Sequence, residues 1–229
     1  MATPLDNPIW HALIGPHARY AIGHGTARRY PPEIAPFAAI AEPSAAAYAD
    51  LAADLPPDAN VMLLHPKDEP LPEGLTAGDA RLLEQMVLAS NHPLPERPPV
   101  RIVPLGPEDA ADMLALVDIA KPGPFAARTV ELGGYAGVRD QNGQLIAMAG
   151  ERLRLPGFVE LSAVCVHPDA RGLGLGAALS LHVIRAALAR GETPFLHVWP
   201  DNPAKALYSR IGFRLRAKLW ALFRRPVAV

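Results

Sequence analysis

The chain has 229 residues, with 22 lysines and arginines, 23 aspartates and glutamates, and a net charge of −1 at pH 7. Its length is sufficient for one large domain or two small ones with a sizeable core. The balanced charge provides no basic field that would attract nucleic acid or acidic lipid, and a single cysteine excludes an intramolecular disulfide.

The first residues lack a basic start followed by an apolar run of signal-peptide length. No apolar stretch anywhere in the chain reaches the roughly 18 residues that a membrane-spanning helix needs. We therefore expect a cytoplasmic protein with no membrane partner and no nucleic-acid partner, and leave open whether it forms a homodimer.

The N-terminal part of the sequence mixes short strands and helices. Residues 19–23 and 60–65 have the pattern of strands, and residues 44–55 form an alanine-rich helix that Ser44 would cap. A second helix is predicted over 77–88 from an apolar stripe at helical spacing. The stripe consists of Leu82, Leu83, Met86 and Val87.

Residues 91–99 are rich in proline and can neither continue a helix nor lie in a central strand. They predict an extended linker and a domain boundary. The predicted organisation is an N-terminal α+β domain over 1–92, a proline-rich linker over 93–99, and a second domain over 100–229.

After the linker, strands and helices alternate. A strand over 100–105 leads to a helix over 107–120, and strands over 135–139 and 145–150 flank the tight turn that Asn142-Gly143 favours. The predicted elements that follow are a strand over 158–166, a helix over 175–190 ended by Gly191, a strand over 195–199, and one or two strands over 213–223. This order predicts an α/β (mixed α+β) fold around a mixed, twisted sheet.

The most informative segment connects the predicted strand 158–166 to the helix that follows it. It contains Arg171-Gly172-Leu173-Gly174-Leu175-Gly176, and glycines before a helix N-terminus let an anion approach free backbone N–H groups. A P-loop is excluded because Ala177-Ala178 stands where Lys and Ser or Thr are needed. The glycine spacing is also wrong for a dinucleotide fingerprint. The remaining pattern is Arg or Gln, two residues, Gly, one residue, then Gly or Ala, and it fits at every position.

That pattern resembles the pyrophosphate-binding turn of the GNAT superfamily of N-acetyltransferases. A second segment, Asn202 to Phe213, resembles the family's later signature of an Asn, a short helix with a Tyr, and a closing Gly-Phe. The resemblance covers about residues 100 to 229. It implies a GNAT-like acyltransferase fold there, and residues 1–92 are either a degenerate acyltransferase-like half or an unrelated α+β extension.

The resemblance also implies the residues that bind the cofactor, acetyl-CoA. The turn would hold its pyrophosphate through Arg171, Gly172, Leu173, Gly174, Gly176 and Ala177. The preceding strand would separate from its neighbour and offer the backbone of Val164, Cys165 and Val166 to the pantetheine arm and the thioester carbonyl. Asn202 would contact the pantetheine, cap the Pro203 helix, or do both.

Acetyl transfer to an amine needs a base to take the amine's proton and an acid to protonate the departing thiolate. Glu160 is the predicted base, since alternation places it on the face of Val164 and a partly apolar cleft would raise its pKa. The alternative is a structural or substrate-anchoring glutamate. The resemblance implies that Tyr208 is the acid, because the family's general acid has the matching position in the later signature, and the alternative is an aromatic that packs the short helix.

Other reactive side chains have weaker support. By alternation Cys165 points away from Glu160 and is a small buried residue rather than a nucleophile. His167, His182 and His197 have no metal-ligand spacing, so no metal is expected. His197 is a second candidate base that would line the acceptor cleft with Trp199.

The predicted activity is an acyl-CoA-dependent N-acyltransferase that moves acetyl from acetyl-CoA directly to a primary amine in a ternary complex. The alternatives are a non-catalytic acyl-CoA-binding regulatory domain of the same fold and a nicotinamide-dependent oxidoreductase. No motif identifies the acceptor, which could be a peptide N-terminus, a lysine, an amino acid, a polyamine, a drug amine or a hydroxyl.

Overall fold

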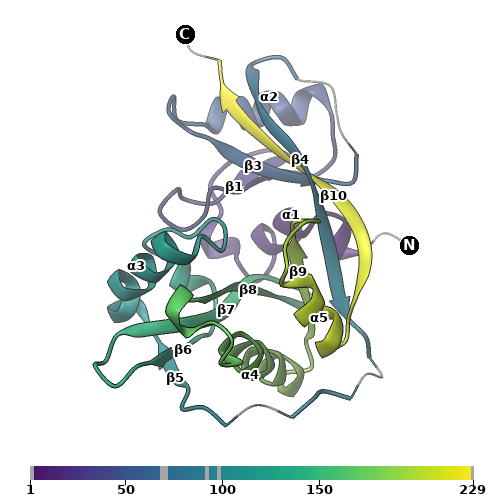
Figure 1. Cartoon of the computed structure of the whole chain (residues 1–229). Coiled ribbons are helices and arrows are strands. Elements are labelled where there is room, and N and C mark those ends of the chain that lie inside the picture. Colours follow the sequence, from purple (N-terminus) through teal and green to yellow (C-terminus); the bar gives the residue numbers. More distant parts are fainter. Residues whose placement is uncertain (1–2, 68–71, 91–92, 97–98, 228–229) are drawn as a thin grey trace.

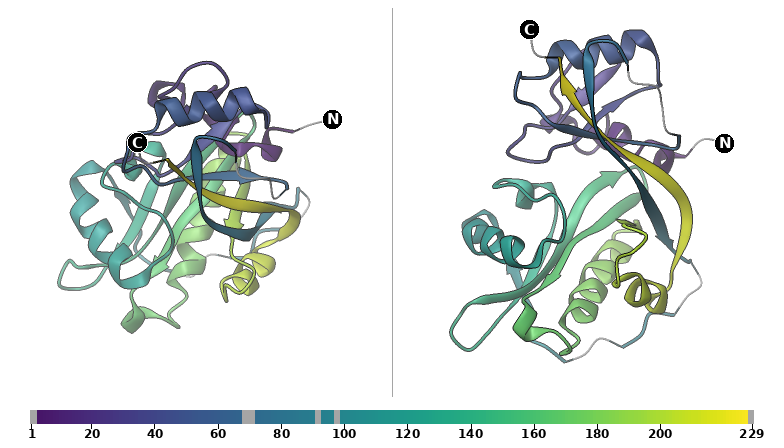
Figure 2. Two further views of the ribbon diagram at one scale, coloured as in Figure 1. Left: turned by 90° about the horizontal axis from the view of Figure 1, so that it is seen from above. Right: turned by 45° about the horizontal axis from the view of Figure 1, so that its top comes forward.

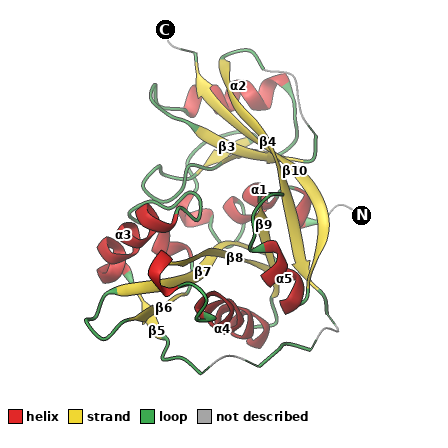
Figure 3. Ribbon diagram, in the orientation of Figure 1, coloured by secondary structure: helices red, strands yellow, loops and turns green. Residues whose placement is uncertain are grey.

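The structure is a computed structural model that describes residues 3–67, 72–90, 93–96 and 99–227. Within these residues the chain forms a two-stranded sheet and an eight-stranded sheet surrounded by helices (Figures 1 and 3). The N-terminal elements are η1 (Pro4–Asp6), α1 (Pro8–Leu13), η2 (Ala18–Tyr20), β1 (Ala27–Arg29), β2 (Ala38–Ile40), α2 (Ala45–Asp54), β3 (Val61–His65) and β4 (Leu75–Leu88).

The remaining elements follow in the predicted order. They are β5 (Val103–Leu105), η3 (Pro107–Asp109), α3 (Ala110–Ala120), η4 (Thr129–Leu132), β6 (Tyr135–Arg139), β7 (Leu145–Leu155), β8 (Phe158–Val166), η5 (Pro168–Ala170), α4 (Leu175–Ala189), β9 (Thr193–Val198), α5 (Lys205–Ile211) and β10 (Phe213–Pro226). The α/β fold class predicted from the sequence is confirmed. The final segment is one long strand.

The eight strands lie in the order β3-β10-β4-β9-β8-β7-β6-β5. All neighbours are antiparallel except β8 and β9, which are parallel. β4 and β10 are long, twist around each other and connect the N-terminal elements to the rest of the sheet (Figure 2). The parallel pair lies in the middle of the sheet, where the candidate site is found.

The helix predicted over 77–88 is wrong, because Leu75–Leu88 is strand β4. Its alanines, leucines and glutamate favour a helix, but backbone pairing with β9 and β10 overrides that preference. Only its second half lies between two strands, and there most side chains are buried. The strand predicted over 19–23 is also wrong, since residues 18–20 form a 3-10 turn and Ile22 makes a single bridge to Arg29.

Several local predictions are confirmed. The Ala47 N–H donates to Ser44 Oγ at 3.1 Å, so Ser44 caps α2. The β6–β7 hairpin turns at Asn142-Gly143, where Gly143 has a φ of 84°. Gly191 ends α4 with a φ of 76°.

The division of the chain into 1–92, 93–99 and 100–229 stays a prediction, as does the acyltransferase-like ancestry of the first part. Residues 91–92 and 97–98 of the predicted linker lie outside the described residues, and residues 93–96 form neither helix nor strand. β3 and β4 pair with β10 and β9, so residues 61–88 share a sheet with residues 193–226.

The two faces of the sheet are covered by different elements. α4 and α5 pack on one face in a cluster that contains Leu161, Leu179, Ile184, Leu196 and Tyr208. The other face is covered by α1 and the segment around Tyr30 and Phe37, and further along by α3. The N-terminal residues therefore bury the part of the sheet where β7, β8, β9 and β4 meet.

Candidate active site at the opening between β8 and β9

β8 and β9 are paired over only part of their length. Their register runs from Phe158 opposite Thr193 to Glu160 opposite Phe195, and no pairing follows. Beyond these residues the two strands separate, which confirms the separation expected from the family resemblance. Backbone groups of both strands are thereby left without a neighbouring strand.

A cavity of about 480 Å³ lies in this opening. Its walls are β8 from Leu161 to Val166, the end of β9 at His197 and Val198, and the segment from Asn202 to Tyr208. Arg171 and Gly176 line it at the glycine turn, and Lys121 and Arg152 line it from α3 and β7. A volume of this size is typical of a small-molecule site.

β8 contains a bulge that the sequence analysis missed. Met148 pairs with Cys165 and Gly150 with Ser162, so three steps along β8 face two along β7. The additional residue is Ala163, whose φ of 53° is unusual for a residue other than glycine. Bulges and unusual backbone conformations of this kind occur at functional sites.

Because of the bulge, side-chain alternation does not continue from Glu160 to Val164. Val164 and Val166 pack with the α4 cluster, as Leu161 does. Cys165 packs with α3 on the opposite face, which is also the face of Glu160. The expectation that Glu160 shares a face with Val164 and opposes Cys165 is therefore wrong, since one inserted residue reverses the alternation.

The glycine turn leads into α4 as predicted. Gly172 and Gly174 have φ values of 81° and 72°, which L-residues with a Cβ rarely adopt. The first N–H groups of α4 have no intrahelical acceptor, and no side chain caps them. A Cβ added at Gly176 would lie 3.7 Å from Val166 Cγ2, on the wall of the cavity. The turn therefore fits an anionic group that continues into this cavity.

Tyr208 lies on α5 and lines the cavity opposite β8. Its ring packs edge-on against Phe213 with centroids 6.1 Å apart, and the residue is 8% exposed. Burial raises the pKa of Tyr208 to about 12, so the phenol stays protonated throughout the physiological range. No described residue forms a hydrogen bond with its hydroxyl. Packing and a donor role are therefore compatible.

Asn202 lies where α5 approaches the cavity. Its Oδ1 accepts a hydrogen bond from the Ala204 N–H at 2.9 Å and so stabilises the turn into the helix. The side-chain amide donates to none of the described residues, and Asn202 lines both this cavity and the adjoining one. α5 begins at Lys205 with Ala204 as its N-cap and no side-chain cap, so the prediction that Asn202 caps the helix is wrong, and a contact with pantetheine stays a prediction.

Glu160 differs from the expectation of a cleft carboxylate with a raised pKa. Its side chain is fully buried, and the walls of the cavity do not include it. Arg152 donates from Nε to Oε2 at 2.9 Å and from Nη2 to Oε1 at 2.7 Å. Burial alone would raise the pKa of Glu160, but the Arg152 charge and the hydrogen bonds from His197 and Arg152 outweigh it and lower the pKa to about 2.

His197 lies between Glu160 and the cavity. Its Nδ1 is 2.8 Å from Glu160 Oε1, and because an ionised carboxylate only accepts hydrogen bonds, Nδ1 carries the proton. Its Nε2 accepts from Gln85 Nε2 at 3.1 Å. The side chain is 2% exposed, whereas the residue as a whole is half-buried, so its backbone faces the opening.

These groups belong to a row of polar side chains that crosses five neighbouring strands, on the face of the sheet that the N-terminal residues cover. The row consists of Arg152 (β7), Glu160 (β8), His197 (β9), Gln85 (β4) and Arg216 (β10), and it ends at Asp6. Gln85 also donates to the Leu5 carbonyl at 2.9 Å, and its Oε1 accepts from Arg216 Nη1 at 2.8 Å. Because both oxygens of the buried Glu160 carboxylate accept hydrogen bonds within this row, its burial is tolerable.

Cys165 is 5% exposed, and burial raises the pKa of its thiol to about 12. It lines the cavity beside Val164 while its side chain packs with the α3 cluster. Such a thiol is neither ionised nor accessible at neutral pH, in agreement with the expectation that it is not a nucleophile.

The structure brings together most of the predicted site residues. The cavity is lined by Val164, Cys165, Val166, Arg171, Gly176, Asn202 and Tyr208. Gly172, Leu173, Gly174 and Ala177 lie in the turn and the start of α4, next to the cavity but not on its wall. Sequence reasoning missed Arg152, Gln85 and Lys121, because no motif relates these residues to the glycine turn.

Among the described residues, no group of three or more histidine, cysteine, aspartate or glutamate side chains could hold a metal ion. Within the same residues, no helix is long and apolar enough to cross a bilayer.

Comparison with known proteins agrees with this geometry. A model of the FR47-like protein family matches residues 135–221, which include β6 to β9, the glycine turn and α5. No curated protein matched the chain. A GNAT-family structure from Novosphingobium aromaticivorans is 38% identical, with a TM-score of 0.89 over 98% of this chain and 99% of that one.

A second structure shows that the fold persists at low identity. A GCN5-related N-acetyltransferase from Kribbella flavida is 18% identical, with a TM-score of 0.65 over 98% of this chain and 97% of that one. Identity at this level shows the fold alone. The match to the Novosphingobium protein over nearly the full length of both chains shows the family: the chain belongs to the GNAT family of acetyltransferases.

Proposed function

We propose that the protein transfers an acetyl group from acetyl-CoA to a primary amine by direct attack within a ternary complex. The observation that carries this proposal is the cavity between the separated strands β8 and β9, which joins a glycine turn at one end to Tyr208 and His197 along its walls. The turn offers backbone N–H groups to a pyrophosphate, and the unpaired β8 backbone can bind an extended pantetheine arm.

The bulge at Ala163 is assigned the stabilisation of the transition state through its backbone N–H groups. Ala163 and Val164 have no register partner on β7, and β9 has already separated at this point. We assign the stabilisation of the negative charge on the thioester oxygen to an N–H of this bulge. A fixed backbone donor needs no rearrangement as the charge develops.

Tyr208 is assigned the protonation of the departing thiolate. Its protonated phenol on the cavity wall can donate as the carbon–sulfur bond breaks. The role of the buried Cys165 is limited to its backbone, since a thiol with a raised pKa cannot carry the acetyl group. Transfer is therefore direct.

The base is assigned to His197, with Glu160 behind it. Neither cavity is lined by a carboxylate of the described residues, and Glu160, with a pKa of about 2, is too weak a base to act directly. His197 has a neutral Nε2, and the Glu160 charge stabilises the imidazolium that forms when a proton arrives through water. Protonation at Nε2 requires the Gln85 amide to rotate and present its oxygen, which breaks its hydrogen bonds with the Leu5 carbonyl and with Arg216.

The test is a thiol-release assay with acetyl-CoA over a panel of amines, combined with binding of acetyl-CoA measured by calorimetry. Amine-dependent release of CoA, with an acetylated amine as product, is the expected result. Tight binding of acetyl-CoA without turnover of any amine would instead identify a binding or regulatory domain. Binding of NADH at the same site would support the oxidoreductase alternative.

A further inference from the structure

A second cavity of about 380 Å³ adjoins the first on the side of the N-terminal strands. The two cavities share Arg152, His197 and Asn202 on their walls. The glycine turn lines only the first cavity, through Arg171 and Gly176. The second cavity therefore lies at the other end of the site, where an acceptor must enter.

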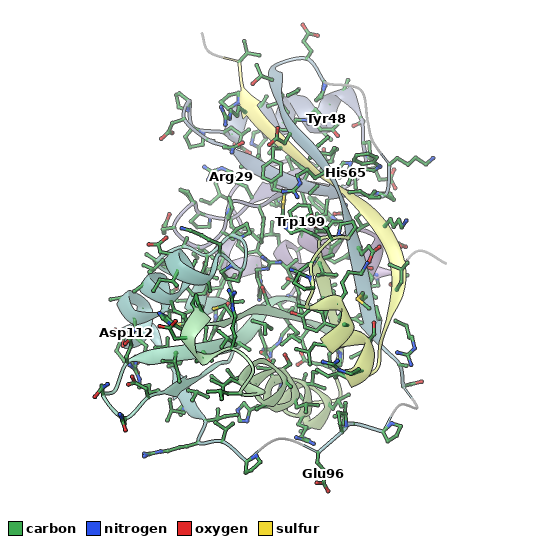
Figure 4. The ribbon with its side chains drawn as sticks, in the orientation of Figure 1. Arg29, Tyr48, His65, Glu96, Asp112 and Trp199 are labelled. Carbon is green, nitrogen blue, oxygen red and sulfur yellow. The ribbon has the colours of Figure 1, made fainter. Side chains whose placement is uncertain are left out.

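Most of its wall is apolar. Met62 comes from β3, Leu83 from β4, Val117 from α3 and Phe223 from β10, and Trp199 follows β9. Arg81 packs over the Trp199 ring, 4.1 Å from its centroid, and holds it in place. Trp199 lies in the middle of the molecule, between the N-terminal elements and β9 (Figure 4). The wall suits an apolar or aromatic group.

The charged groups on this wall are cationic. Arg152 binds Glu160 through Nε and Nη2, and its Nη1 donates to none of the described residues. The side chain is 12% exposed and lines both cavities, so the Nη1 N–H groups are available to a ligand. A guanidinium edge of this kind matches a carboxylate.

A second cation and the absence of carboxylates support the same charge preference. Lys121 ends α3 and lines both cavities, with its ammonium 3.2 Å from the exposed Asp118. No aspartate or glutamate of the described residues lines the second cavity. A polyamine or a lysine side chain would therefore find no counter-charge here, whereas an anionic group would find the unpartnered Nη1 edge of Arg152.

We propose that the acceptor is an α-amino acid with an apolar or aromatic side chain. Its side chain lies against Trp199 and Phe223, and its carboxylate accepts hydrogen bonds from Arg152 Nη1. The α-amine then faces Asn202 and the opening between β8 and β9. The inference rests on the proposed function and specifies its substrate class.

The reaction balances with the groups present. The α-ammonium loses a proton through water to His197, and its nitrogen forms a bond to the acetyl carbonyl carbon. The carbon–sulfur bond breaks with its electron pair on sulfur, Tyr208 protonates the thiolate, and the nitrogen gives its second proton to the resulting tyrosinate. The products are the N-acetyl amino acid and CoA, and His197 returns its proton to solvent.

The experiment compares three matched amines with the wild-type protein: L-phenylalanine, L-phenylalaninamide and 2-phenylethylamine. We expect kcat/KM to be about tenfold to hundredfold higher for L-phenylalanine, which corresponds to the loss of one charge-assisted hydrogen bond of about 1.5–3 kcal/mol. L-phenylalaninamide has the less basic amine, so more of it is unprotonated and nucleophilic at pH 7. A higher kcat/KM for L-phenylalanine therefore cannot be explained by the amount of unprotonated amine.

Two variants locate the effect. Arg152→Lys keeps a positive charge near Glu160 but removes Nη1. The ratio of kcat/KM for L-phenylalanine to kcat/KM for L-phenylalaninamide should therefore fall by a larger factor than kcat/KM for L-phenylalaninamide itself. Trp199→Ala should reduce the preference for L-phenylalanine over glycine. Arg139→Lys, at an ion pair with Asp109 and Asp112 away from both cavities, is the matched control and should leave these ratios unchanged.

Higher kcat/KM for the amide or for 2-phenylethylamine would overturn the proposal and point to a peptide N-terminus or a simple amine, while the proposed acetyltransferase activity would stand. Turnover of none of the amines despite binding of acetyl-CoA would overturn both. Unchanged substrate ratios in a folded Arg152→Lys variant would also contradict the assignment of the carboxylate to Arg152.

Discussion

Glu160 and His197 lie on adjacent parallel strands and are joined by a 2.8 Å hydrogen bond between Oε1 of the carboxylate and Nδ1 of the imidazole. Arg152 holds the carboxylate from the other side, so the pKa of Glu160 is lowered to about 2 and the carboxylate is ionised at neutral pH. The carboxylate thereby fixes both the tautomer and the orientation of the histidine.

This relationship predicts separate effects for the two residues. His197→Asn keeps a donor close to the position of Nδ1 but removes the proton acceptor, and it should lower kcat by about a hundredfold or more with little change in acetyl-CoA affinity. An unchanged kcat in the folded variant would exclude His197 as the base.

Glu160→Gln should destabilise the protein strongly, because it leaves the buried Arg152 charge unpaired. Breaking a buried ion pair typically costs about 3–5 kcal/mol, which chemical denaturation would measure. Asp118→Asn is the matched control, since its pair with Lys121 is exposed and should contribute less than about 1 kcal/mol. Equal losses in the two variants would show that the Glu160 pair is not a structural requirement.

Tyr208→Phe should lower kcat by about a hundredfold or more while leaving the acetyl-CoA dissociation constant unchanged, because it removes the hydroxyl and keeps the ring packed on Phe213. Tyr20→Phe is the control, since it removes a hydroxyl that donates to the Glu131 carbonyl away from the cavity. Full activity in Tyr208→Phe would limit that residue to packing.

Gly172 and Gly191 offer a matched comparison of the turn. Both have positive φ, of 81° and 76°, and a Cβ on either would meet no atom within 4 Å. Gly172→Ala and Gly191→Ala should therefore lose similar stability, about 1–2 kcal/mol. Only Gly172→Ala should weaken acetyl-CoA binding in calorimetry, because its methyl group would lie where the pyrophosphate approaches the backbone. Equal affinities would place the pyrophosphate elsewhere.

Stability should fall as the pH drops from about 6.5 to about 4. His17 is buried with Nδ1 2.8 Å from the Tyr30 hydroxyl, and burial, with the charge of Arg154, lowers its pKa from 6.5 to about 4. Between these values the unfolded chain binds the proton and the folded chain does not, so protonation favours unfolding. His17→Gln should flatten the free energy of unfolding across this window, and an unchanged slope would contradict the assignment.

The sequence was sufficient to predict the glycine turn, the position of Tyr208 and most of the elements from β5 onward. Those predictions rest on local features, such as the glycine spacing and the Asn142-Gly143 turn, that act over a few residues. The strand Leu75–Leu88 could not be recognised in the same way, since its helix-forming residues become a strand only through pairing with β9 and β10.

The chemistry of Glu160 was also beyond local reasoning. A single inserted residue at Ala163 reverses which side chains share a face, and an alanine gives no signal for a bulge. Gln85 and Arg216 reach the row of Glu160 and His197 from strands far apart in sequence, and Arg152 reaches it from the neighbouring strand β7. The lowered pKa of Glu160 comes from Arg152 and His197, and His197 is brought beside it only by the order of strands in the sheet.

The account is tested most directly by initial rates of CoA release with acetyl-CoA and an acceptor amine varied together, and with the acetylated amine quantified in the same samples. Direct transfer in a ternary complex predicts intersecting double-reciprocal lines and one acetylated amine for each CoA released. Parallel lines would indicate an acetylated enzyme intermediate. CoA release that does not depend on amine would contradict acetyl transfer in the opening between β8 and β9.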